Sequence, residues 1–251
     1  MDTDFEKKLY NAIASEYNQR VNADRTIKIL EKKITLGRAT QKDVATLSER
    51  LGKHAGDSII KVVPGAIPDK KMYVATANAT IKPLMMNVHA RVNTAAIIEQ
   101  AFEDAAKGLK INLVKGGSDA VYPMIQSIIS AKDFEAMVAS EAITTAHKFY
   151  DDFQIANLDL RTEMGYTSYV TREYDDVGLH GKHETCHYCK DREGVYEYPG
   201  EANAVEVFLR HPGCGCTIEM TTEKGTMRQT KWYADRDEAG KKIKSTGNIW
   251  E

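Results

Sequence analysis

Cysteine is scarce in this sequence and confined to two short runs. The 251 residues contain four cysteines, all within 183-HETCHYCKDREG-194 and 207-VFLRHPGCGC-216. Four cysteines can form two disulfides, but the N-terminal MDTDFEKKLYNAI lacks the apolar segment of a secretory signal, so we expect a reducing compartment. Clustered cysteines in a reducing compartment favour a metal site over disulfide bridges.

Long apolar runs and a dominant charge are also missing. No run approaches 18 apolar residues, so we expect a soluble chain with no membrane span. Lys and Arg total 34 against 36 Asp and Glu, for a net charge of -2, which excludes an overall basic footprint for nucleic acid. Gly116-Gly117 lacks the spacing of a phosphate-binding loop. No internal repeat stands out, and the length predicts one or two domains.

Helical periodicity dominates the first quarter of the chain. Apolar residues recur every three or four positions over 4–36, and Gly37 is the predicted stop. Thr40 begins a second helix with Asp43 in a capping-box position, and Gly52 ends its strongest part. We expect an antiparallel helical hairpin over 4–54, which either forms a small core or oligomer contact, or docks on a large partner.

The middle of the chain is less regular. PGAIPDKK at 64–71 contains two prolines and predicts a break, and MYVATANATI after it fits either a strand or a helix. Residues 91–109 predict a helix that ends near Gly108, and residues 115–123 predict a turn. The Ala-rich apolar seam of that helix comprises Val92, Ala95, Ala96, Ile98, Phe102 and Ala105.

The second half begins with a helix and continues with strands. Helical spacing predicts a helix over 131–157, in which Glu141 is expected to be solvated and His147 to be a surface or hydrogen-bonded histidine. YTSYVTREY after Gly165 is typical of a strand. CTIEMTT and TMRQTKWYA flank EKG and predict a hairpin, and the charged tail predicts an arm or frayed end.

The cysteines and one histidine have the spacing of metal ligands. Cys186-x2-Cys189 is followed, after 21 residues, by His211-x2-Cys214-x-Cys216. A Cys-x2-Cys turn brings two thiolates within reach of one tetrahedral zinc, and the Pro-Gly inside the second turn allows a tight reversal. Five candidates compete for four positions, and His180, His183 and His187 flank them. The alternative is a set of reduced or disulfide-linked cysteines without metal.

A thiolate-rich zinc site is structural rather than catalytic, because thiolates damp the Lewis acidity of the metal. We expect it to pin a long loop over 190–210 between short strands. The predicted fold class is α+β, with a mainly helical N-terminal half and a small zinc-stapled, β-containing C-terminal domain. The predicted segments are a helical hairpin (1–63), a mixed, mainly helical segment (64–130), the Cys/His domain (131–225), and a strand with a charged arm (226–251).

With these motifs identified, residues 130–222 resemble the phage Mu protein F-like minor head proteins, a family of phage head morphogenesis proteins. The family pattern is a helix with a central Glu, a strand, Thr-Cys-x2-Cys, and finally His-Pro-x-Cys-x-Cys before another strand. It corresponds here to VASEAITTAHKFY, YTSYVTREYDD, 185-TCHYCKDREGVYEY-198 and 211-HPGCGCTIEM-220. Gly215 and Ala139-Ser140 stand where the family commonly has Arg and Arg-Thr.

The resemblance implies a non-enzymatic virion component. Family members associate with the portal region or the inner capsid and act in head assembly or DNA delivery. The expected partners are therefore portal and major capsid proteins within a large assembly, with packaged DNA as a further contact and no membrane. The expected location is the virion head, and the host cytoplasm during assembly.

Two other classes remain open at this point. A zinc-stapled nuclease of the HNH kind would use His183, Asn203 and His211, although His211 is better explained as a ligand. A nucleic-acid-binding zinc module would use basic and aromatic residues around the site, which nearby acidic residues offset. These residues are Lys190, Arg192, Arg210, Lys224, Arg228 and Lys231, with Tyr188, Tyr196, Tyr198, Trp232 and Tyr233.

Overall fold

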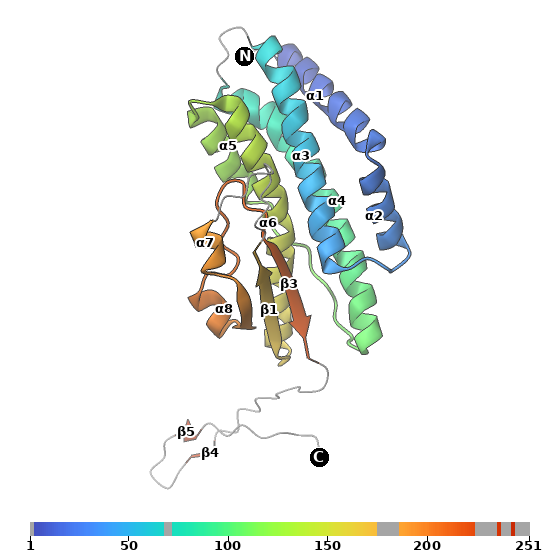
Figure 1. Cartoon of the computed structure of the whole chain (residues 1–251), viewed down its shortest axis with the longest axis vertical. Coiled ribbons are helices and arrows are strands. Elements are labelled where there is room, and N and C mark those ends of the chain that lie inside the picture. The colour runs from blue at the N-terminus through green and yellow to red at the C-terminus, as the bar shows by residue number, and fades with distance from the viewer. Residues whose placement is uncertain (1–2, 68–71, 175–185, 224–234, 237–241, 244–251) are drawn as a thin grey trace.

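The α+β architecture is confirmed in a computed structural model, in which six helices precede a small antiparallel sheet (Figure 1). The structure describes residues 3–67, 72–174, 186–223, 235–236 and 242–243. The helices are α1 (Thr3–Ala23), α2 (Arg25–Thr35), α3 (Gln41–Ala66), α4 (Val74–Lys107), α5 (Val121–Ser130), α6 (Phe134–Glu163), α7 (His187–Lys190) and α8 (Gly200–Ala204). The strands are β1 (Ser168–Glu173), β2 (Gly194–Tyr198), β3 (Thr217–Thr222), β4 (Asp235–Arg236) and β5 (Lys242–Ile243).

Asp24 divides the predicted helix over 4–36 into α1 and α2, so the prediction of one continuous helix is wrong. The Asp24 carboxylate accepts hydrogen bonds from the backbone N–H groups of Thr26 and Ile27, which caps α2. Burial opposes its charge, but hydrogen bonds from His54 and Arg50 outweigh burial and lower the pKa of Asp24 to about 2. The helix start is therefore anchored to α3.

The second predicted helix is longer than expected. The capping box of Thr40 and Asp43 is confirmed, but α3 passes through Gly52 and Pro64 and ends at Ala66. A Cβ atom on Gly52 would lie 2.7 Å from the Ala142 carbonyl oxygen, so this glycine permits close packing of α3 on α6. The prediction that the strongest part of the helix ends at Gly52 is therefore wrong. The prediction that the break begins at Pro64 is wrong as well, because α3 continues to Ala66.

The ambiguous segment MYVATANATI is helical and forms the start of α4. The predicted helix over 91–109 is the C-terminal part of α4. Gly108 ends α4 in the left-handed conformation with φ 71°. The predicted turn over 115–123 is confirmed as far as Val121, where α5 begins. The Ala-rich apolar seam predicted for this helix is not fully buried, since the Phe102 side chain is 51% exposed.

Helix α6 confirms the predicted helix over 131–157 and runs through the centre of the molecule. Asp133 caps its N-terminus by accepting the Ala136 N–H. Helices α3, α4 and α5 and the sheet all pack against α6, which buries it on most sides. The prediction that Glu141 is solvated is wrong, because its side chain is buried. The prediction for His147 is wrong as well, because it is buried and neither ring nitrogen has a hydrogen-bond partner among the described residues.

The three-stranded sheet has the order β2-β1-β3 and is antiparallel throughout. Val170 of β1 lies opposite Tyr196 of β2 and Met220 of β3. The predicted strands at YTSYVTREY and CTIEMTT are confirmed. The expected loop over 190–210 instead contains β2 and α8, because Val195 and Tyr196 continue the sheet. The second strand of the predicted 217–234 hairpin lies outside the described residues.

One hydrophobic core joins residues from α1 to β3. It runs across the predicted segment boundaries at 63 and 130, and the division into domains stays an interpretation of the sequence. The cysteines form a second, separate cluster beside this core. Within the described ranges, none of the helices combines the length and apolar character that a membrane crossing requires.

Candidate metal centre

Two short turns bring the five predicted ligands together. Cys186 precedes the single turn of α7, whose Cys189 and Lys190 N–H groups donate to the Cys186 carbonyl oxygen. The second turn repeats this geometry, since the Cys214 N–H donates to the His211 carbonyl oxygen. Gly213 adopts φ 77°, a left-handed conformation that glycine accepts without strain. Each Cys/His-x2-Cys spacing therefore folds into a turn with both side chains on one side.

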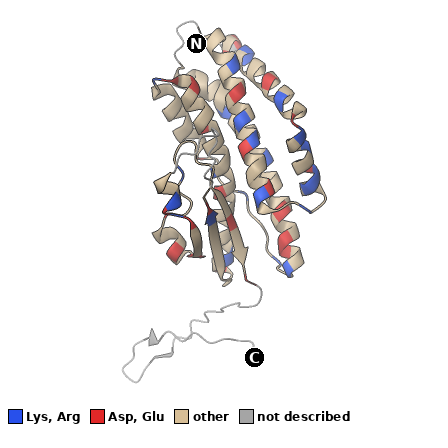
Figure 2. Cartoon of the chain, in the orientation of Figure 1, with Lys and Arg blue, Asp and Glu red and all other residues tan. Residues whose placement is uncertain are grey.

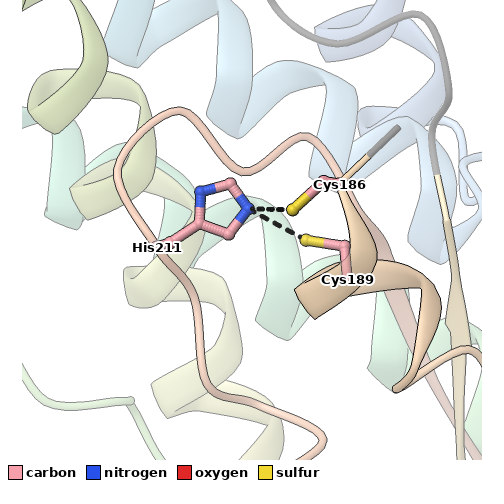
Figure 3. Close-up of side chains that lie close together, drawn as sticks. All are labelled: Cys186, Cys189 and His211. Carbon is pink, nitrogen blue, oxygen red and sulfur yellow. Dashed lines mark hydrogen bonds between the residues drawn. The ribbon is translucent and has the colours of Figure 1, made fainter. Parts of the chain in front are cut away.

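The donor atoms of the two turns face one another (Figure 3). His211 Nε2 lies 3.1 Å from Cys186 Sγ and 3.0 Å from Cys189 Sγ. Cys189 Sγ lies 3.7 Å from Cys214 Sγ. The donors form two groups, Cys186–Cys189–His211 and Cys189–Cys214–Cys216, and within each group all atoms lie within 4.8 Å of one another. Cys189 belongs to both groups, which makes it the centre of the cluster.

The donor set fits a metal ion that prefers sulfur and nitrogen. All four cysteines are free thiols rather than disulfides. Two thiolates bound to one tetrahedral zinc are about 3.8 Å apart, given a Zn–S distance of about 2.3 Å. The Cys189–Cys214 separation of 3.7 Å agrees with this edge. The five predicted residues therefore form groups that can hold a metal ion.

Hydrogen bonds distinguish the thiols of the second group. Hydrogen bonds from the Cys189 and Cys216 thiols lower the pKa of Cys214, and nearby Arg210 adds to this effect. Sharing those protons with Cys214, together with burial, raises the pKa of Cys189 and of Cys216. Cys214 is thus the thiol of this group that loses its proton most readily.

Arg172 supplies positive charge directly to the sulfur cluster. Its Nη2 lies 3.5 Å from both Cys189 Sγ and Cys214 Sγ, while Nη1 donates to the carbonyl oxygens of Val207 and Leu209. Burial works against its charge, but the neighbouring cysteines outweigh burial and raise its pKa. No carboxylate forms an ion pair with Arg172 among the described residues, so the sulfurs act as its counter-charge.

Arg210 connects the cluster to helix α6. It forms a buried ion pair with Asp151, at 2.5 Å from Nε to Oδ2 and 2.9 Å from Nη2 to Oδ1. Nη1 donates to the Cys216 carbonyl oxygen and lies 3.8 Å from Cys214 Sγ. Burial disfavours the guanidinium charge, but Asp151 outweighs it and raises the pKa of Arg210. Arg210 is therefore a structural anchor, and its predicted use as a surface phosphate contact is wrong.

His211 is oriented by its neighbours. Its Nδ1 lies 2.9 Å from the Pro212 carbonyl oxygen, a contact that places the proton on Nδ1 and leaves Nε2 free to bind a metal. The Tyr188 and His211 rings pack edge to face with centroids 5.7 Å apart, and the Arg192 guanidinium lies over the Tyr188 ring at 3.8 Å. These contacts cover the outer side of the cluster.

His147 lies near the cluster but belongs to neither donor group. Burial lowers its pKa to about 3, with Arg210 adding to the effect, so the imidazole is neutral. Both ring nitrogens lack a hydrogen-bond partner among the described residues. His187 is exposed and outside both groups, and His180 and His183 lie outside the described residues.

Several of the described residues that were proposed for nuclease or nucleic-acid functions have other places in the fold. Asn203 is exposed on α8, and Tyr198 is buried with its hydroxyl bonded to Asp159. Arg192 also forms an ion pair with Glu206. Lys224, Arg228, Lys231, Trp232 and Tyr233 lie outside the described residues.

Arg172 and Asp151 are the residues that sequence reasoning missed. One signal for Arg172 was present: it follows Ser168 and Val170 in strict alternation, so it occupies the buried face of β1. Asp151 offered no such signal, because its partner Arg210 is 59 residues away.

A scan against protein-family models and searches of curated proteins and of solved structures find no match to this chain.

Proposed function

We propose that this chain is a non-enzymatic minor head protein of a tailed bacteriophage, stapled by a structural zinc ion. It would associate with portal and major capsid proteins in the virion head, after assembly in the host cytoplasm. Packaged DNA is a further contact in this proposal. The proposal rests on the resemblance of residues 130–222 to the Mu protein F-like pattern and on how its pieces meet in space.

The observation that carries the proposal is the contact between the helix of that pattern and its most specific piece. The helix with the central Glu is α6, and the His-Pro-x-Cys-x-Cys run is the turn before β3. The Gly213 N–H of this turn donates to Thr144 Oγ1 of α6 at 2.8 Å. About two turns further along α6, Asp151 forms an ion pair with Arg210. Motif pieces that are distant in sequence therefore form one packed unit, as a shared structural role requires.

The chemistry of the donors favours a structural ion. Three or four thiolates donate strongly to zinc and reduce its ability to polarise a substrate. Cys189, Cys214 and Cys216 are buried, and Cys186 and His211 are partly covered. When bound, zinc would hold α7 against the turn of His211 to Cys216, while Arg172 and Arg210 balance the negative charge of the thiolates. The unit then serves as a rigid docking piece on the helical body.

Metal content tests the first half of the proposal. Protein purified without chelator should contain about one zinc per chain by elemental mass spectrometry. Cys189→Ser should lose the metal, because Cys189 belongs to both donor groups, whereas His187→Ala should retain it as the matched control. A wild-type protein without metal, or a Cys189→Ser variant that keeps it, contradicts the structural-zinc proposal.

Location tests the second half. Peptides of this chain should be present in purified phage particles, at low copy number relative to the major capsid protein, when the particles are analysed by quantitative mass spectrometry. The purified chain should also bind portal or capsid subunits in a pull-down. Absence from particles together with failure to bind either subunit contradicts a minor head protein.

A further inference from the structure

The two outer edges of the three-stranded sheet differ in how their backbone groups are bonded. At β3, glutamine side chains from the helices take the place of a further strand. The Met220 N–H donates to Gln41 Oε1 at 2.7 Å, and Gln41 Nε2 donates to the Met220 carbonyl oxygen at 2.6 Å. Gln154 Nε2 donates to the Ile218 carbonyl oxygen at 3.0 Å. Helices α3 and α6 therefore close this edge at Met220 and Ile218.

The outer edge of β2 is open at Val195. In an antiparallel pair, every second residue of a strand points both its N–H and its C=O away from the neighbouring strand. The Glu197 N–H donates to Glu201 Oε2 at 3.0 Å, so Glu197 is a residue of this kind, and Val195, two residues earlier, is another. Among the described residues, neither the N–H nor the C=O of Val195 has a hydrogen-bond partner, and this residue is 62% exposed. An unpaired edge of this kind is a template for a further strand.

The surroundings of this edge are acidic. Residues 190–206 contain five acidic residues and two basic ones. One of the bases, Arg192, forms an ion pair with Glu206, and the other, Lys190, lies on α7. Figure 2 shows acidic residues in red on β2 and α8. A ligand with positive charge complements this edge. Three acids in or beside β2 are exposed and have no ion-pair partner among the described residues: Glu193, Glu197 and Glu201.

We propose that β2 accepts an extended basic segment of a partner protein as a fourth strand of the sheet. The backbone of that segment would bond the N–H and C=O of Val195. Val195 and Glu197 lie on the same face of the sheet, so an apolar side chain of the segment would lie beside Val195 and a Lys or Arg two positions away beside Glu197. In strand addition of this kind, main-chain bonds give affinity and alternate side chains give specificity.

The same charges disfavour two other occupants. Pairing of β2 with β2 of a second copy would bring acidic residues of the two copies together, and like charges on paired strands are destabilising. Nucleic acid is bound mainly through its phosphates, which carboxylates repel. This surface is separate from the function proposed above, since no residue of β2 belongs to either metal donor group.

A set of peptides provides the test. The probe is the fluorescein-labelled peptide Thr-Lys-Thr-Val-Thr-Lys-Thr, in which the lysines and the valine share one face when the peptide is extended. One comparison peptide has glutamates in place of the lysines, and another is N-methylated at its central amides, which blocks strand pairing without changing the charge. Fluorescence anisotropy with the full chain should show saturable binding of the lysine peptide, at least about tenfold tighter than of either comparison peptide. No saturation, or equal affinity for the N-methylated peptide, overturns the proposal.

Variants of β2 locate the binding. Val195→Pro removes the outward N–H but no hydrogen bond to β1, so the sheet can accept it. It should weaken binding of the lysine peptide at least about tenfold, whereas Val195→Thr keeps the N–H and should bind within about twofold of the wild type. Glu197→Lys should also weaken binding and should reverse the preference toward the glutamate peptide. Glu135→Lys, in the first turn of α6, is the matched control for the change of net charge. Circular dichroism checks that each variant folds.

Hydrogen exchange with mass spectrometry gives a readout that needs no variant. The lysine peptide should slow amide exchange in residues 194–198, because the Val195 N–H gains a partner, and the N-methylated peptide should not. Unchanged exchange there, or unchanged affinity in Val195→Pro, overturns the proposal. A concentration-dependent dimer in sedimentation velocity that Val195→Pro abolishes would assign the edge to a second copy and overturns it as well.

Discussion

At the scale of single residues, the buried arginines explain how a cluster of thiolates is tolerated inside a protein. A divalent ion with three or four thiolates keeps a net negative charge, which burial disfavours. Arg172 contacts two of the sulfurs, and Arg210 contacts one while pairing with Asp151. Their fixed positions near the cluster therefore offset its charge and also hold the loop carbonyl groups around it.

A second buried charge system lies where α3, α4 and β3 meet. Glu99 is 3% exposed, and its Oε2 has no hydrogen-bond partner among the described residues. Burial is the main cause that raises the pKa of Glu99 to about 9, and the carboxylates of Glu103, Asp104 and Glu219 add to it. Glu99 is therefore protonated at neutral pH and shares its proton with Glu103.

Replacing Glu99 with Gln should change how stability depends on pH. The folded-state pKa of about 9 exceeds the ordinary value of 4.5, so the folded protein binds this proton more tightly than the unfolded chain. Wild-type stability is therefore lost as pH rises from about 4.5 to 9. Glu99→Gln, which cannot ionise, should match the wild type near pH 4.5 and exceed it by on the order of 3 kcal/mol at pH 7.

Urea unfolding at a series of pH values from 4.5 to 9 measures this difference. Glu163→Gln is a suitable control, since Glu163 is exposed at the end of α6 and should leave the pH profile unchanged. A Glu99→Gln profile parallel to that of the wild type would show that Glu99 is ionised in the folded protein.

At the scale of elements, the packing of α3 on α6 determines where the metal centre is built. Gly52 and Gly56 of α3 lie against Ala142 of α6, and the Ser48 hydroxyl donates to the Ala146 carbonyl oxygen. These small residues let the two backbones approach closely. The same stretch of α6 presents Thr144 and Asp151 to the turn that carries His211 and Cys214.

Two glycine substitutions in α3 should have opposite effects. A Cβ atom in Gly52→Ala would lie 2.7 Å from the Ala142 carbonyl oxygen and 2.8 Å from Ala146 Cβ, so the helices must separate. We expect a loss of about 1–3 kcal/mol of unfolding free energy. Gly65→Ala meets nothing within 4 Å and should stabilise the helix by up to about 1 kcal/mol.

Thermal and urea unfolding of both variants provide the measurement, and Gly65→Ala serves as the matched control for a change of helix propensity alone. Equal effects of the two substitutions would show that α3 and α6 do not pack as closely at Gly52 as described.

Helices were the elements most readily predicted from the sequence, and their errors have physical causes. Apolar spacing located α3, α4 and α6, because each buries a continuous face. The break at Asp24 was missed because it depends on a side-chain cap held by residues of another helix. Glu141 and His147 were misplaced because α6 is covered on most sides, and a helix of this kind loses the periodic contrast that marks a solvated face.

At the scale of the whole molecule, local spacing predicted the ligands, but not what surrounds them. The turns of Cys186 and His211 are short-range features, so the sequence was sufficient to name all five candidates. Strand β2 and helix α8 were both missed. The segment GVYEY becomes a strand only because it pairs with β1, and the sequence does not reveal that pairing. Arg172 and Asp151 likewise acquire their roles only when distant segments meet.

Because the cysteine cluster is separate from the main hydrophobic core, metal removal should affect one end of the molecule. The core that joins α1 to β3 contains none of the cysteines. The zinc proposed above would contribute on the order of 10 kcal/mol of binding free energy to its own turns. After chelation, amide hydrogen exchange should rise in α7 and in residues 205–216, whereas α3, α4 and α6 keep their protection.

Hydrogen exchange with mass spectrometry, before and after treatment with a chelator, measures this pattern. Cys189→Ser should resemble the chelated wild type and show no further response to chelator. Loss of protection throughout α3 and α6 would mean that the metal sustains the entire fold, contrary to the separation of the two clusters. Unchanged exchange in residues 205–216 would mean that Arg172 and Arg210 alone hold this loop, since their bonds to Leu209, Cys216 and Asp151 do not require a metal.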